Sequence, residues 1–146
     1  MVGKISLDAS IVVKWFKKGE AHERQALKVR DDIFTMKVHA IAPELLLLEV
    51  VRALVKIGYP KLKIEGAYST LKEAASLNLI ELAPMCGLLD KAKEVEVELS
   101  LSASDATYLA ASIVHNADLL TEDKHLLGNH VLKYAEKDGI HILSLK

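Results

Sequence analysis

The chain has 146 residues, 51% of them hydrophobic, with 19 Lys and Arg against 20 Asp and Glu and a formal net charge of −1. This length suits one domain with an apolar core, and no stretch approaches the roughly 20 unbroken apolar residues of a transmembrane helix. The balanced charge excludes a protein that holds nucleic acid by bulk positive charge alone. We therefore predict a single domain over residues 1–146 with no membrane-spanning segment.

A single cysteine, Cys86, excludes an internal disulfide and any zinc or iron–sulfur site built from cysteines. The first residues, Met1–Lys4, lead directly into a predicted strand and lack the apolar region of a signal peptide. These two features predict a cytoplasmic location.

Short apolar runs alternate with segments of helical periodicity along the whole chain. In chain order, the pattern predicts a strand at 4–7, helices at 10–16 and 20–34, a strand at 39–42, helices at 43–57 and 61–77, and a strand at 79–82. It then predicts helices at 88–99 and 104–115, a strand at 119–121, a helical turn at 123–127, a helix at 131–137 and a strand at 140–143. Strands separated by helices predict a parallel α/β sheet with helices on both faces.

Two aspartates follow predicted strands. Asp8 ends the first strand, and Asp123 comes two residues after the fourth. Ligands of an open α/β sheet bind beyond the carboxyl ends of the strands, near the point where the strand order reverses. If the first and fourth strands are neighbours, both carboxylates face one crevice. The alternative for each aspartate is an N-cap of the helical segment that follows it.

Two further acidic residues lie on predicted helices. Glu49 lies in an apolar run, residues 45–51, where a charged group needs a partner or a metal. We favour a functional role, and the alternative is an ion pair with Arg52, one helical turn further on. Asp105 has the capping-box spacing to Ser102, but it also opens a helix that should pack on the sheet, with its first turn toward the strand ends.

Four converging carboxylates need a counter-charge. Two like charges about 4 Å apart repel by several kcal/mol at intermediate dielectric, and a divalent ion removes that repulsion. The six histidines show no paired ligand spacing, and phosphate-loop, dinucleotide-binding and serine-nucleophile motifs are absent from the sequence. Oxygen-only ligands favour Mg²⁺ or Mn²⁺, which can activate water for attack on a phosphodiester. Such an ion would also engage phosphate where a basic surface is missing.

The segments that carry these residues resemble, in order, the PIN domain, and most closely the VapC-type toxins of toxin–antitoxin pairs. The matching segments are residues 6–10, 43–50, 101–110 and 120–126. The resemblance covers essentially the whole chain and implies a five-stranded parallel sheet of order 3-2-1-4-5. It implies a Mg²⁺- or Mn²⁺-dependent endoribonuclease. The acidic site that it implies consists of Asp8, Glu49, Asp105 and Asp123, with Ser10 and Thr121 in support.

The resemblance also implies partners. We expect single-stranded or structured RNA as the substrate, a homodimer, and a cognate antitoxin that covers the active-site groove. Arg52 departs from the family, in which Asn is frequent at this place; the alternatives are that it contacts substrate, that it orients Glu49, or that it is only a surface partner. An aspartyl-phosphate protein would need a second carboxylate beside Asp8, which the segment Asp8-Ala9-Ser10 lacks. The remaining alternative is a non-catalytic PIN-fold module that binds RNA or protein.

Overall fold

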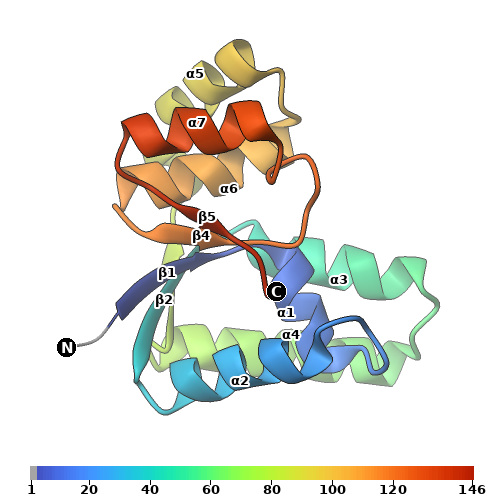
Figure 1. The fold of residues 1–146 in the computed structure, drawn as a ribbon. Coiled ribbons are helices and arrows are strands. Elements are labelled where there is room, and N and C mark those ends of the chain that lie inside the picture. The colour runs from blue at the N-terminus through green and yellow to red at the C-terminus, as the bar shows by residue number, and fades with distance from the viewer. Residues whose placement is uncertain (1–2) are drawn as a thin grey trace.

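A five-stranded parallel sheet forms the centre of the molecule (Figure 1). The computed structural model describes residues 3–146. The strands are β1 (Gly3–Leu7), β2 (Val38–Pro43), β3 (Ile80–Ala83), β4 (Asp118–Leu120) and β5 (Ile142–Leu143). Their order is β3-β2-β1-β4-β5, and all neighbours run parallel. The predicted α/β class and strand order are thus confirmed, and the order reverses between β1 and β4, where such sheets bind ligands.

Helices cover both faces of the sheet. They are α1 (Ala9–Phe16), α2 (Glu23–Phe34), α3 (Leu46–Lys56), α4 (Lys61–Ser76), α5 (Leu89–Leu99), α6 (Ala103–Val114) and α7 (Asn129–Lys137), with a short 3-10 helix, η1 (Met85–Gly87). Figure 1 shows α1, α2 and α4 on one face, with α3 packed against α1 and α4, and α5, α6 and α7 on the other. None of the helices in the described part of the chain has the length and apolar character needed to cross a bilayer.

The most deeply buried helix is α6. All seven residues from Ala106 to Ser112 are buried, and the helix contacts β1, β2 and β4. Small side chains such as Ala106 and Ala110, both fully buried, let its backbone approach the strands closely. This close packing brings the first turn of α6, which contains Asp105, toward the carboxyl ends of β1 and β4.

Several predicted boundaries differ from the structure. The helix predicted from residue 43 begins at Leu46, because the Glu44 N–H donates to the Ala83 carbonyl (3.0 Å) and extends the pairing of β2 with β3. The predicted helical turn at 123–127 is an isolated turn, in which the Leu127 N–H reaches the Asp123 carbonyl (3.1 Å) before Gly128 ends it. The final strand is shorter than predicted, and η1 was not predicted.

Candidate functional site: a carboxylate cluster at the sheet edge

Asp8 lies directly after β1 and is only 5% exposed. Its N–H donates to the Leu120 carbonyl (3.2 Å), which continues the pairing of β1 with β4. Its Oδ2 accepts hydrogen bonds from the Ser10 N–H (3.3 Å), from the Ser10 hydroxyl and from the Thr121 hydroxyl (2.9 Å). Asp8 is therefore the N-cap of α1, as the alternative interpretation predicted. Capping, however, uses only one of its two oxygens.

The hydroxyls of Ser10 and Thr121 connect the two loops at this edge. The Ser10 Oγ accepts from the Glu122 N–H (2.9 Å), and the Thr121 Oγ1 accepts from the Asp123 N–H (2.9 Å). All hydrogen bonds that residues 3–146 donate to the Asp8 carboxylate reach Oδ2. The Oδ1 of Asp8 therefore receives no hydrogen bond from residues 3–146. The hydrogen bonds to Oδ2 hold the carboxylate in place. A carboxylate that is fixed through one oxygen and has the other free is suited to coordinate a metal ion.

The other two aspartates of the predicted site are Asp123 and Asp105. The Asp123 Oδ1 accepts from the His125 N–H (2.7 Å), so this residue also caps a turn. The Asp105 N–H donates to the Ser102 hydroxyl (3.2 Å), which makes Ser102 the N-cap of α6. The capping box is only half formed, because within residues 3–146 the Ser102 N–H donates no hydrogen bond to the Asp105 carboxylate. The Ser102 hydroxyl lies close enough to lower the pKa of Asp105, but no well-formed hydrogen bond from residues 3–146 occupies the carboxylate.

Neighbouring charges affect the protonation of Asp105 and Asp8. Burial first, and then the negative charges of Asp123 and Asp8, together raise the pKa of Asp105 to about 6, against the lowering effects of the Ser102 hydroxyl and of His125. Burial also raises the pKa of Asp8, against the lowering effect of its hydrogen bonds from Ser10 and Thr121, and Asp123 adds to the rise. The fold therefore places the carboxylates of Asp8, after β1, and Asp105, on α6, where their ionisation is unfavourable without a cation.

Glu49 is held by α6 instead of by Arg52. The Ser104 hydroxyl donates to its Oε1 (2.8 Å), which connects α3 to the residue beside Asp105. No ion pair joins Glu49 to Arg52 within the described residues, and Arg52 is exposed. The predicted ion-pair alternative is therefore wrong. Ser104 was not predicted as a site residue, although its position directly before Asp105 indicated that it could contact the site.

The donor chemistry of this edge fits a hard cation. The Asp8 Oδ1 lacks a hydrogen-bond donor from residues 3–146, and carboxylate oxygens are the ligands that such cations prefer. No three Asp, Glu, His or Cys side chains of residues 3–146 are already grouped closely enough to share one ion. Mg²⁺ keeps several of its waters and binds through one or two carboxylates in many sites. A preformed cage is therefore not required, and the four-carboxylate ligand set stays a prediction.

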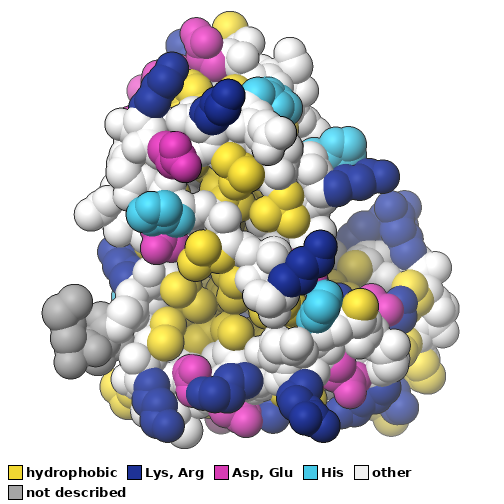
Figure 2. Space-filling model, viewed as in Figure 1, with side chains coloured by type: hydrophobic (Ala, Val, Ile, Leu, Met, Phe, Trp, Pro, Cys, Tyr) yellow, Lys and Arg dark blue, Asp and Glu magenta, His cyan; other side chains and the backbone are white. Residues whose placement is uncertain are grey.

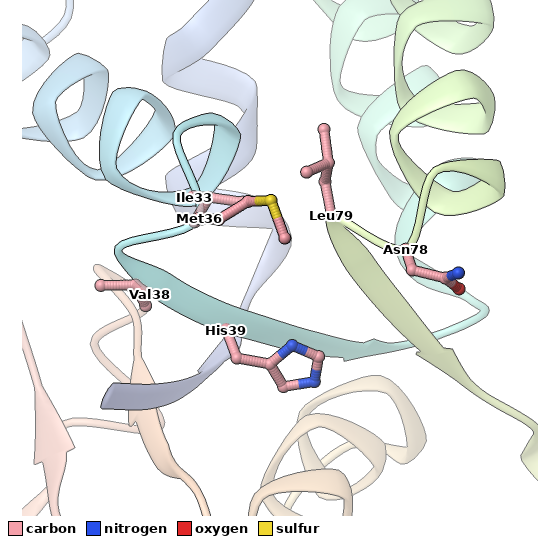
Figure 3. Close-up of a pocket in the computed structure, with 6 residues that line it drawn as sticks. All are labelled: Ile33, Met36, Val38, His39, Asn78 and Leu79. Atoms are coloured by element: carbon pink, nitrogen blue, oxygen red, sulfur yellow. The ribbon is translucent and has the colours of Figure 1, made fainter. Parts of the chain in front are cut away.

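Two surface pockets lie at different positions relative to the carboxylates. A pocket of about 320 Å³ opens beside the aspartates and is lined by Ser100, Leu101, Ser102, Asp105 and His125. An apolar pocket of about 280 Å³ lies at the opposite end of the sheet, where β2 and β3 begin, and Figure 3 shows Met36 and Leu79 at its wall. Only the first of these two pockets adjoins the acidic cluster. It therefore offers room for a substrate group next to Asp105.

Comparisons with known proteins identify the fold and the family of the chain. The solved structures that resemble the chain include a toxin–antitoxin complex from Klebsiella pneumoniae, with a TM-score of 0.61, 18% sequence identity, and 86% of this chain and 92% of that chain covered. At this identity the likeness concerns the fold. No curated protein matches the chain significantly. The profile of the PIN domain matches residues 5–128, which include every residue of the carboxylate cluster. The chain therefore belongs to the PIN domain family.

Proposed function

We propose that this protein is a metal-dependent endoribonuclease and the toxin of a VapC-type toxin–antitoxin pair, acting in the cytoplasm. The observation that supports the proposal most is that Asp8 and Asp123 act on the pKa of Asp105, which is raised to about 6, near the point where the strand order reverses. Membership of a family whose members are generally nucleases supports the reaction type. The solved neighbour described as a toxin–antitoxin complex supports the biological role.

The acidic residues and two neighbouring hydroxyls have the following roles in this proposal. Asp8, Asp105 and Asp123 hold Mg²⁺ or Mn²⁺, and Glu49 completes the site directly or through a bound water. The cation supplies activated water and charge neutralisation at the phosphodiester. Ser10 and Thr121 fix Asp8 through their hydroxyls. We expect cleavage to leave 5′-phosphate and 3′-hydroxyl ends.

A non-catalytic RNA- or protein-binding module is the second candidate. Such a module has no need for carboxylates whose ionisation is unfavourable in the fold. Figure 2 shows Lys and Arg side chains scattered around the margin of one face, with acidic side chains among them. This distribution offers RNA no broad basic surface on that face.

The first prediction concerns metal dependence. The purified protein should cleave single-stranded RNA with Mg²⁺ or Mn²⁺ and lose all cleavage in excess EDTA, because no cationic side chain replaces the charge of the metal. Asp8→Asn should be inactive, whereas Asp90→Asn, which changes an exposed carboxylate on α5, should cleave normally. Gel analysis of labelled RNA measures all four conditions. Undiminished cleavage in EDTA contradicts metal dependence, and RNA binding without cleavage favours the non-catalytic module.

The second prediction concerns stability of the metal-free protein. Because the pKa of folded Asp105 is about 6 and its unfolded value lies near 3.8, the folded state binds the proton more tightly between these values. Stability should therefore rise as pH falls from about 7 toward about 4. Asp105→Asn should weaken this rise and, at pH 7, be more stable than wild type by an amount on the order of 1 kcal/mol. Melting curves at pH 5 and pH 7 test this.

The capping role of Ser102 does not confound that comparison. It uses the Asp105 N–H, which the Asn variant retains. Added Mn²⁺ should stabilise the wild type more than Asp105→Asn, since a ligand that binds only the folded state stabilises by mass action. Equal pH dependence and equal Mn²⁺ response in the two proteins, together with normal cleavage by the variant, would remove Asp105 from the site.

The third prediction concerns Arg52, which we propose contacts an RNA phosphate. It is exposed on α3, one turn beyond Glu49. Arg52→Ala should lower kcat/KM about fivefold to tenfold and reduce the salt slope of RNA binding by about one, the values typical of one phosphate contact. Melting should change little. Lys56→Ala, exposed one turn further along the same helix, is the control, and equal behaviour of both variants assigns Arg52 to the solvated surface.

The fourth prediction concerns assembly. Several apolar side chains on the helices are unusually exposed: Leu48 (63%), Leu62 (84%) and Val97 (75%). A pocket of about 470 Å³ between α3, α4 and the end of β3 has mostly apolar walls. We propose that a second copy of the chain and the antitoxin cover such surfaces. Light scattering at micromolar concentration should give the mass of a homodimer, and a monomeric mass counts against this assembly.

A further inference from the structure

Tyr108 of α6 is a buried residue whose hydroxyl has no role in the fold as described so far. It is 0% exposed and the largest of the fully buried side chains. Its hydroxyl makes no well-formed hydrogen bond with any residue in the described range 3–146, although the Glu49 carboxylate and the Ala9 backbone lie close enough to influence its pKa. Buried polar groups in native proteins nearly always have a partner, and an unpaired hydroxyl destabilises the fold. A group of this kind points to a hydrogen bond that the resting arrangement leaves incompletely formed.

The position of Tyr108 relates it to Glu49. It lies four residues after Ser104, so both side chains share one face of α6. Ser104 already donates from this face to the Glu49 Oε1 (2.8 Å). The Glu49 Oε2 receives no hydrogen bond from residues 3–146. The same helix face therefore carries a second hydroxyl, that of Tyr108, near the Glu49 carboxylate, whose Oε2 is not hydrogen-bonded by residues 3–146.

The electrostatics of Tyr108 agree with this placement. Burial raises its pKa, and the negative charges of Glu49 and then Asp8 raise it further. The phenol therefore stays protonated at all physiological pH values and is always able to donate. Asp8 and Glu49 come from different elements, β1 and α3, and Tyr108 is within the electrostatic reach of both.

We propose that Tyr108 is a positioning residue of the carboxylate cluster, whose hydroxyl donates to the Glu49 carboxylate beside Ser104 when a divalent cation is bound. The proposal rests on the metal-dependent function proposed above. Carboxylates at metal sites are themselves hydrogen-bonded, and loss of such a partner typically weakens metal binding by 10–100-fold. Glu49 is half-buried and has only one well-formed hydrogen-bond donor in the resting state, so a second donor would fix its orientation. The competing view is that Tyr108 only fills the core.

Tyr108→Phe separates the two views because it keeps the ring and removes only the hydroxyl. Mn²⁺ binding measured by isothermal titration should weaken about tenfold. The melting temperature of the metal-free variant should not fall, since the deleted hydroxyl has no partner there. Tyr59→Phe is the matched control, because its hydroxyl donates to the Phe16 carbonyl (2.7 Å) in a different part of the molecule. That control should melt lower and keep wild-type Mn²⁺ affinity.

A second variant protects the test from a folding artefact. Ser104→Ala should also weaken Mn²⁺ binding, and adding Tyr108→Phe to it should cost less than the sum of the two single effects, because both hydroxyls act on Glu49. Wild-type Mn²⁺ affinity in Tyr108→Phe overturns the positioning role and leaves the proposed function intact. Absence of Mn²⁺ binding by the wild-type protein overturns the proposed function itself, and the role of Tyr108 with it.

Discussion

The close packing of α6 on the sheet is the constraint on which the candidate site depends. Alanines along its buried face allow the helix to lie directly against β1, β2 and β4. Its first turn is therefore carried to the switch-point edge, where Asp105 meets the aspartates that follow β1 and β4. The same approach places Ser104 against Glu49 of α3. A bulky side chain at Ala106 or Ala110 would push α6 outward and separate these groups.

Electrostatic repulsion then gives this edge its chemical character. Burial and neighbouring charge raise the pKa of both Asp8 and Asp105, so the carboxylates are held together against their own repulsion. The hydroxyls of Ser10 and Thr121 counter this by donating to one oxygen of Asp8. A bound cation would remove the remaining repulsion. This balance ties the stability of the metal-free protein to the function that we propose.

The sequence predicted most of the fold because its signals are local. Apolar periodicity and the residues that end each strand located the sheet and placed Asp8 and Asp123 at its edge. The contacts of Glu49 could not be predicted in this way. They depend on which helix packs against α3, and periodicity within one helix does not reveal its neighbour. The Arg52 pairing was therefore wrong, and the hydroxyls of Ser104 and Tyr108 were not identified.

Proton release on Mn²⁺ binding shows whether the carboxylate cluster is the metal site. A metal that binds there must displace protons from carboxyls that the fold keeps partly protonated. Isothermal titration at pH 6 and pH 8, in buffers of different ionisation enthalpy, counts those protons. With the pKa of Asp105 at about 6, binding at pH 6 should release about half a proton or more from the cluster, and binding at pH 8 close to none. Mn²⁺ binding without proton release at pH 6 would contradict the account.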